Sequence, residues 1–143
     1  MVTERIDAAL FAHQQAAEGF ISRYRAELVT VAARLSQSFK QGGKLLVCGN
    51  GGSACDAMHI AGEFVGRFVD DRPALPAIAL SADSGAITAI GNDYGFEQIF
   101  SRQVEAYGKE GDALIALSTS GASPNVLAAL KTARDKKLFT VLF

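Results

Sequence analysis

Four short apolar runs, each separated from the next by a helical segment, dominate the chain after Gly43 and limit the folds open to it. Each run is bounded by glycine, proline or polar residues and has the length of a buried strand. Buried strands that alternate with helices predict a parallel sheet covered on both faces, with right-handed crossovers. The expected strands are residues 44–48, 76–81, 113–118 and 138–143, and the expected helices lie near 53–68, 83–107 and 124–136.

The segment before the sheet has helical periodicity from about residue 3 to residue 41, and Gly42–Gly43 ends it. We expect one domain over 1–143, with a helical part (1–42) and an α/β part (43–143). The fold class is α/β, a three-layer sandwich preceded by two N-terminal helices that carry His13 as a surface or interface residue. The chain stops at the end of an apparent strand, which predicts that the C-terminal part of the domain is missing from it.

Charge and cysteine content exclude several classes of protein. The formal net charge is −1, which argues against a broad basic surface for nucleic acid. Only Cys48 and Cys55 are present, and we interpret both as reduced thiols. The first residues resemble no signal peptide, and no run approaches the roughly 20 apolar residues of a membrane span. A cytoplasmic protein without membrane contact is expected.

The first candidate binding element is the glycine-rich turn after residues 44–48, which contains Asn50, Gly51 and Gly52. Glycines allow close approach of the backbone to a ligand, and the free N–H groups of the following helix attract anions. The spacing fits neither a dinucleotide-binding nor a Walker loop. The alternative interpretation is an ordinary strand-to-helix turn.

The second candidate element follows the strand at 113–118 and is rich in hydroxyl groups. It contains Ser118, Thr119, Ser120 and Ser123, and Pro124 follows as the first residue of a helix. Hydroxyls and backbone N–H groups can together surround a phosphate without a lysine. The alternative is that these residues only form a turn, and Ser123 is in any case expected to cap the helix. Because ligands of open α/β sheets bind at the carboxyl ends of the strands, two such turns predict a phosphorylated ligand.

The helix after the first turn carries a polar face. Cys55, His59 and Glu63 are spaced by four residues, and Asp56 lies near the same face. His59 and Glu63 could provide two zinc ligands, with the others from elsewhere, or Glu63 could be a general base. His59 could equally be a structural histidine.

A glycine-framed polar segment at 91–95 contains Asn92 and Asp93, which could hold sugar hydroxyls. The alternative there is a helix break with an Asx-type turn.

At this level of detail the sequence resembles a known family, the phosphoheptose isomerases, which are the sedoheptulose 7-phosphate isomerases of the SIS (sugar isomerase) family. The resemblance covers about residues 40–143, with a matching helical N-terminus. It rests on GNGGSACDAMHIAGEFVGRF (49–68), RPALPAIALS (72–81), GNDYGFEQIFSRQVEAYGKEGD (91–112) and LSTSGASPNVLAAL (117–130).

The resemblance implies a homotetramer with active sites between subunits. It implies conversion of sedoheptulose 7-phosphate to D-glycero-D-manno-heptose 7-phosphate through an enediol, the first step toward the heptoses of lipopolysaccharide core and other surface glycans. Glu63 would be the acid/base residue, and His59 with Glu63 would contribute to a zinc site. The residues that would bind the substrate are Asn50, Gly51, Gly52, Glu63, Asn92 and Asp93, and those that would bind its phosphate are Ser118, Thr119, Ser120 and Ser123.

The chain departs from the family pattern in one respect. Family members carry a histidine and a glutamine on their last helix that complete the acid/base pair and the zinc site, whereas this sequence has only His13 and His59. We therefore expect the 143 residues alone to be catalytically incomplete. Two alternatives within the SIS fold are a non-catalytic protein resembling the DnaA initiator-associating protein, and another sugar-phosphate-binding or aminosugar isomerase domain. Glu63 favours the heptose isomerase over the former.

Overall fold

A computed structural model describes residues 2–143. Its contacts divide the chain between Ala33 and Arg34 into two compact units. The second unit contains a four-stranded parallel sheet with the order β2-β1-β3-β4. The strands are β1 (Leu45–Gly49), β2 (Ala77–Ala79), β3 (Ala113–Leu117) and β4 (Phe139–Leu142). All four expected strands are therefore confirmed, to within one or two residues at most ends.

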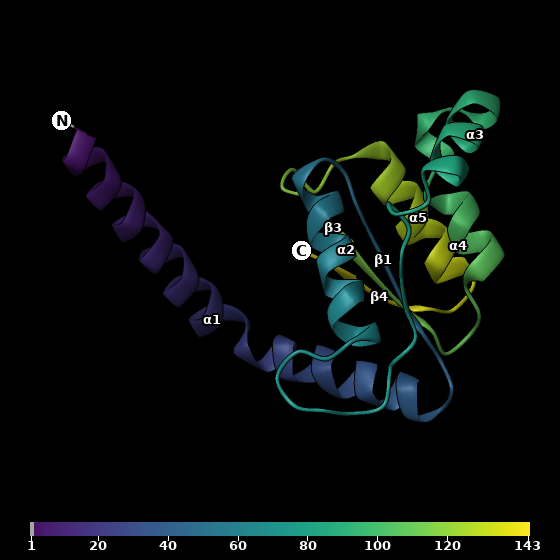
Figure 1. Cartoon of the computed structure of the whole chain (residues 1–143), viewed down its shortest axis with the longest axis horizontal. Helices are drawn as coiled ribbons and strands as arrows, with labels where there is room; N and C mark the ends of the chain where they lie inside the picture. Colours follow the sequence, from purple (N-terminus) through teal and green to yellow (C-terminus); the bar gives the residue numbers. More distant parts are fainter. Residues whose placement is uncertain (1) are drawn as a thin grey trace. The chain divides into compact units, whose positions relative to one another are not determined.

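The helices of the second unit cover both faces of this sheet, as expected. Helix α2 (Gly52–Val65) lies on one face, and α4 (Ser101–Tyr107) and α5 (Pro124–Asp135) lie on the other (Figure 1). The single helix expected over 83–107 is instead divided into α3 (Ser84–Tyr94), a 3₁₀ turn η1 (Phe96–Gln98) and α4. Gly95 separates α3 from η1 because its φ of 90° is not helical.

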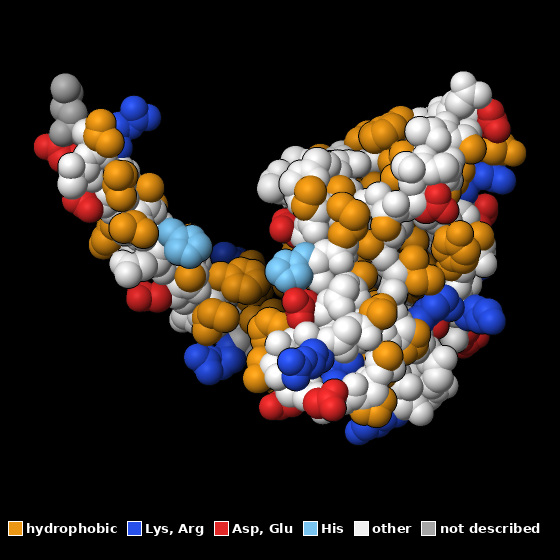
Figure 2. All heavy atoms as spheres, in the orientation of Figure 1, with side chains coloured by type: hydrophobic (Ala, Val, Ile, Leu, Met, Phe, Trp, Pro, Cys, Tyr) orange, Lys and Arg blue, Asp and Glu red, His pale blue; other side chains and the backbone are white. Residues whose placement is uncertain are grey.

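The first unit is helical and forms part of a single helix, α1 (Val2–Lys40). The prediction of two N-terminal helices is wrong on this point. No proline interrupts the segment, and Gly19 is the only glycine within it, which a long helix tolerates. Within residues 2–33, large apolar side chains remain exposed, and Figure 2 shows hydrophobic side chains in orange along this helix. His13 is exposed, as expected.

The core of the second unit explains why the central strands read as continuous apolar runs. Every residue of β1 is buried, because helices pack on both faces of the strand. On one face Leu46, Cys48 and Leu114 pack with Phe100 and with the apolar side of α5. No helix among the described residues is both long and apolar enough to span a bilayer.

The two cysteines are free thiols, as expected, but lie in different surroundings. Burial in the core raises the pKa of Cys48 to about 12, whereas Cys55 is exposed on α2. At pH 8 only about one Cys48 in ten thousand would be a thiolate, the form that reacts. We expect a thiol reagent such as DTNB to titrate one cysteine in the folded chain and two in denaturant. Rapid reaction of both in the folded chain would contradict this placement.

The same shift predicts a pH dependence of stability. The unfolded chain loses the Cys48 proton near pH 9, and the folded chain only near pH 12. The free energy of unfolding should therefore fall as the pH rises through this interval, because the unfolded state binds fewer protons there. A Cys48→Ala variant provides the control, since it should lack this part of the decline.

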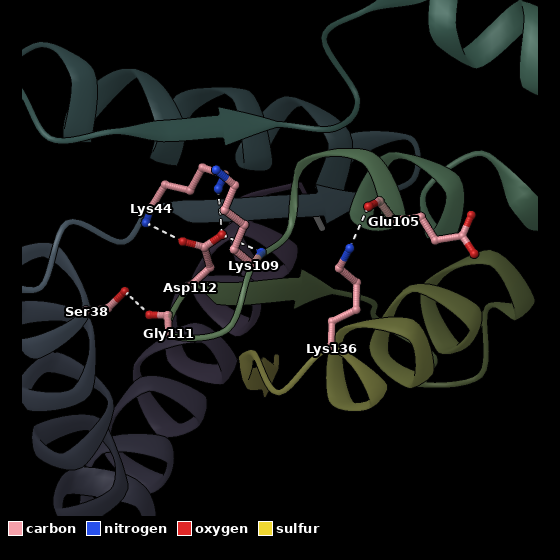
Figure 3. A network of polar contacts seen from close by, with 7 residues as sticks. All are labelled: Ser38, Lys44, Glu105, Lys109, Gly111, Asp112 and Lys136. Carbon is pink, nitrogen blue, oxygen red and sulfur yellow. Dashed lines mark hydrogen bonds and ion pairs between the residues drawn. The ribbon is translucent and has the colours of Figure 1, made fainter.

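The amino-terminal ends of β1 and β3 are joined by a buried ion pair. Asp112, just before β3, is 3% exposed, and Lys44, just before β1, places its Nζ 2.6 Å from the Asp112 carboxylate. The same carboxylate accepts hydrogen bonds from the backbone N–H groups of Lys44 and Lys109, and Ser38 Oγ donates to the carbonyl of Gly111 (Figure 3). These contacts join the starts of the two central strands, at the edge opposite the two glycine- and serine-rich turns.

Candidate active site

The two predicted binding turns leave the sheet side by side. Strands β1 and β3 are adjacent and parallel, and Gly49 lies opposite Leu117 in their register. Asn50 and Ser118 therefore follow at the same edge. The side-chain amides of Asn50 and Asn125 then join the turns directly, since each Nδ2 donates to the other's Oδ1 at 2.9 Å. The expectation that the two turns share one rim of the sheet is thereby met.

Glycine is required in the first turn for two separate reasons. A Cβ on Gly49 would lie 2.7 Å from Ser53, so a side chain there would collide with the start of α2. Gly51 has a φ of 56° and occupies the N-cap position of α2, where it offers no side chain to the helix. The N–H groups of the first turn of α2, which begins at Gly52, thus receive no side-chain cap.

The serine-rich turn gathers its hydroxyl groups around Ser118. The Ser118 Oγ lies 3.2 Å from the Oγ of Ser123 and 3.4 Å from the Oγ of Ser120. Ser120 Oγ also accepts from the N–H of Ala122, and Thr119 is exposed beside it. Hydroxyls that contact one another can rotate to donate to an anion instead.

Ser123 does not cap α5 with its side chain, so that prediction is wrong. It occupies the N-cap position, but its hydroxyl contacts Ser118 and makes no capping hydrogen bond. Pro124 begins the helix, as expected. Helix α3 differs, because Asp83 caps it by accepting from the N–H of Ala86 at 2.9 Å. Neither α2 nor α5 receives a side-chain capping bond from its N-cap residue, but in α5 Pro124 has no N–H and the N–H of Val126 already donates to Asn125 Oδ1. The N–H groups at the start of α2 are therefore the main backbone donors at this edge, and such groups attract anions.

His59 and Glu63 lie together but at a distance from the turns. His59 Nε2 is 3.0 Å from Glu63 Oε1, one helical turn apart on α2, and the Glu63 side chain is 34% exposed. Glu63 follows Gly52 by eleven positions, which corresponds to about 16 Å along the helix. The structure thus brings His59 to Glu63, but a single chain does not bring Glu63 beside its own serine-rich turn.

Arg72 fixes the end of α2 that carries Glu63. Its guanidinium donates to the carbonyls of Glu63 at 2.6 Å and Phe64 at 2.9 Å, near the negative end of the helix dipole. This role of Arg72 could not be predicted from the sequence, because an arginine before a proline does not indicate a contact with the end of a helix.

Asn92 and Asp93 bond to each other and not to the two binding turns. They lie in the last turn of α3, where Asn92 Nδ2 donates to Asp93 Oδ1 at 2.8 Å. No hydrogen bond among the described residues joins either of them to Asn50 or to the serine-rich turn.

No group of three or more His, Cys, Asp or Glu residues in the described chain could hold a metal ion. His59 and Glu63 alone are an incomplete zinc site.

Comparisons with known proteins agree with this geometry. A family model for the SIS domain matches residues 11–141. A phosphoheptose isomerase from Burkholderia pseudomallei is 54% identical over 140 residues, which are 98% of this chain and 67% of that protein. This chain belongs to the phosphoheptose isomerase family. Another phosphoheptose isomerase, from Trichlorobacter lovleyi, is 61% identical over 116 residues, 81% of this chain and 59% of the relative.

Two solved structures of this family share the fold over nearly the whole chain. The phosphoheptose isomerase of Neisseria gonorrhoeae superimposes with a TM-score of 0.92 and 40% identity, and that of Francisella tularensis with 0.94 and 37%. Each match covers 99% of this chain and 74% of the solved chain. The chain spans 67% of the Burkholderia pseudomallei relative and 59% of the Trichlorobacter lovleyi relative, so these phosphoheptose isomerases are longer than this sequence, as expected.

Proposed function

We propose that this protein acts as a phosphoheptose isomerase, converting sedoheptulose 7-phosphate to D-glycero-D-manno-heptose 7-phosphate. The observation that carries the proposal is the meeting of the two turns through the amides of Asn50 and Asn125. That contact brings the N-terminus of α2, which has no side-chain cap, and the hydroxyls of Ser118, Ser120 and Ser123 to one edge. This set of donors suits the dianionic phosphate of the sugar.

The remaining predicted residues have roles that follow from their chemistry. Asn50, Gly51 and Gly52 would contact the sugar beside the phosphate, and Asn92 with Asp93 would hold its hydroxyls. A carboxylate such as Glu63 can remove a proton from C1 of the ketose while the C2 oxygen gains one, which yields the enediol. Return of a proton to C2, with loss of the proton from the C1 hydroxyl, completes the aldose.

The separation of Glu63 from the turns supports an active site shared between copies of the chain. About 16 Å of helix lies between Gly52 and Glu63, so the Glu63 that meets a given phosphate site would come from another subunit. The proposal includes the homotetramer implied by the family resemblance. Exposed apolar residues in the first unit support it, because they need a partner surface: Ile6, Leu10, Phe11 and Ile21 are more than 40% exposed.

Zinc remains part of the proposal, with His59 Nε2 and Glu63 Oε1 as two of its ligands. Bound zinc would polarise a substrate oxygen or hold the site together. The other ligands must come from outside the described residues, so no step above depends on the metal. The proposed cytoplasmic location and the supply of heptose for lipopolysaccharide core rest on the family resemblance alone.

The proposal is tested first by binding and then by turnover. Titration calorimetry of the 143-residue chain should detect sedoheptulose 7-phosphate but not unphosphorylated sedoheptulose. For turnover, this chain should replace the matching residues of the Burkholderia pseudomallei relative, which supplies the rest of a family-length protein. Isomerisation by this chimera is expected. Binding without turnover in the chimera would favour a non-catalytic SIS protein instead.

Ser120 provides a direct test of the phosphate site. Ser120→Ala should weaken binding of sedoheptulose 7-phosphate by about 1–3 kcal/mol, because one hydrogen bond to a charged group is lost. Calorimetry with the 143-residue chain measures this change. Thr88→Ala is the matched control, since the Thr88 hydroxyl donates to the carbonyl of Ser84 in α3. Equal dissociation constants for the wild type and Ser120→Ala would count against the site.

A further inference from the structure

Asn125 lies in the first turn of α5 and is 2% exposed, yet nothing in the sequence pattern assigns it a role. We infer that Asn125 is a positioning residue, which fixes the side-chain amide of Asn50 in one orientation for the sugar phosphate. The inference concerns how the site is held together, and it rests on the proposed function only in taking Asn50 as a substrate contact.

The contact between the two amides is reciprocal. Asn50 Nδ2 donates to Asn125 Oδ1 at 2.9 Å, and Asn125 Nδ2 donates to Asn50 Oδ1 at 2.9 Å. A pair of parallel hydrogen bonds fixes the plane of the second amide as well as its distance. The pair links residues 75 positions apart, Asn50 in the glycine-rich turn and Asn125 in the helix that follows the serine-rich turn.

The backbone at the start of α5 determines which amide atom of Asn125 is the oxygen and which is the nitrogen. The N–H of Val126 donates to Asn125 Oδ1 at 3.0 Å, and a backbone N–H cannot accept. The Asn125 amide atom that lies near both Val126 N and Asn50 must therefore be the oxygen, and the other amide atom that faces Asn50 must be Nδ2. Consequently the Asn50 oxygen faces Asn125 Nδ2, so the orientation of the Asn50 amide is set by the helix through Asn125.

This arrangement leaves part of Asn50 available to a ligand. Together, the two hydrogen bonds of the pair use one Nδ2 hydrogen and one Oδ1 lone pair of Asn50. One hydrogen and one lone pair remain, and Asn50 is only half-buried, whereas Asn125 is buried beneath it. A ligand-binding amide held in this way loses little side-chain entropy on binding, which favours affinity.

Gln103 shows what a purely structural buried amide looks like in the same molecule. It is 4% exposed, and its Nε2 donates to the backbone carbonyls of Leu80 and Ile99. Its two hydrogen bonds therefore join two backbone segments, and neither bond goes to a residue of the glycine-rich or serine-rich turn. Asn125 instead uses its amide on the side chain of a half-buried residue at the ligand edge, which distinguishes a positioning role from simple packing.

The experiment compares four variants of the 143-residue chain: Asn125→Ala, Asn50→Ala, the double variant and Gln103→Ala as the matched control. The first readout is the ¹⁵N–¹H spectrum of the Asn50 side-chain amide, assigned by its loss in Asn50→Ala. In Asn125→Ala the Asn50 Nδ2 hydrogen that bonds to Asn125 Oδ1 should exchange with water about tenfold faster, because its hydrogen bond is absent. In Gln103→Ala its exchange should be unchanged.

The second readout is binding by calorimetry. Asn125→Ala should weaken sedoheptulose 7-phosphate about tenfold and inorganic phosphate less than about twofold. The double variant should bind no more weakly than Asn50→Ala, because Asn125 acts through Asn50. Additive losses, or equal losses for both ligands, would mean that Asn125 is only structural and would overturn the inference.

The two ideas fail in distinguishable ways. If the wild-type chain does not bind the sugar phosphate, the proposed function fails, but the Asn50 amide spectrum still tests the role of Asn125. An unchanged Asn50 spectrum in Asn125→Ala would overturn the inference whatever the binding result. Should Asn125→Ala not fold, Asn125→Ser keeps an oxygen near the N–H of Val126 but is too short to pair with the Asn50 amide, so the same spectrum decides.

Discussion

Replacing Glu63 by Gln should lower kcat for sedoheptulose 7-phosphate by about two to four orders of magnitude, the range for loss of a general base. Glutamine has nearly the same shape as glutamate, but its amide cannot accept a proton from carbon. The Glu63 side chain lies on the surface of α2 and is 34% exposed, so the fold should persist. The KM should change much less than kcat.

The measurement uses the chimera with the Burkholderia pseudomallei relative, with circular dichroism to confirm that the variant is folded. Glu105→Gln is the matched control, because the Glu105 side chain is exposed on α4 and the bond from Lys136 Nζ goes to the Glu105 backbone carbonyl, which the substitution keeps. Near-normal turnover in Glu63→Gln would remove Glu63 from the reaction. A loss in both variants would indicate damage unrelated to the base.

The same variant tests whether the site is shared between copies. Ser120→Asp would place a carboxylate at the proposed phosphate site, so this variant should also be inactive. If Glu63 and Ser120 of different copies form one site, oligomers assembled from both variants contain some sites with both natural residues. Co-expression should then restore activity well above the sum of the two separate variants. Activity equal to that sum would mean that one chain supplies both residues.

The strands were predictable because their signal is local. Residues 44–48 and 113–118 are short runs rich in apolar residues, the first preceded by a glycine and the second by an aspartate, and each is followed by a polar turn. Because these strands are buried on both faces, their apolar residues follow one another without polar residues between them. The boundaries within helical regions were harder. Residues 3–41 have the periodicity of a helix, but periodicity does not show whether one helix or two are present, and the structure has one.

The sequence predicted only those parts of the candidate site in which the residues of a single turn indicate ligand binding by themselves. Glycines after one strand and serines after another indicate a ligand edge, and parallel strands bring such edges together. Asn125 was missed because its partner Asn50 is 75 residues away, and an asparagine in the first turn of a helix is unremarkable. Ser123 was misread for a related reason, since its hydroxyl turns to Ser118 rather than to its own helix.

Removing the Asp112 carboxylate should have the largest effect on stability of any single change considered. Asp112→Ala leaves the Lys44 ammonium and the N–H groups of Lys44 and Lys109 without their acceptor. Loss of one partner from a buried ion pair costs about 3–5 kcal/mol. We expect the lower end, about 3 kcal/mol, because the Lys44 side chain keeps 20% exposure and remains partly hydrated.

Urea unfolding of the 143-residue chain measures this loss, and Glu110→Ala provides the matched control. Glu110 lies two residues earlier and also pairs with a lysine, Lys137, but those side chains are 70% and 71% exposed. Exposed pairs contribute little, so Glu110→Ala should change stability by less than about 1 kcal/mol. An Asp112→Ala loss no larger than this would show that the buried pair contributes little net stability.

The consequence of Asp112→Ala for ligand binding follows from where the pair lies. Lys44 and Asp112 immediately precede β1 and β3, and the register of these two strands places Gly49 opposite Leu117 at the other end. Asn50 and Ser118 meet only because that register holds. Under conditions where Asp112→Ala remains folded, sedoheptulose 7-phosphate should therefore still bind within about twofold, since the sheet keeps its hydrogen bonds. A large loss of affinity in the folded variant would mean that the ion pair, rather than the strand ladder, maintains the alignment of the two turns.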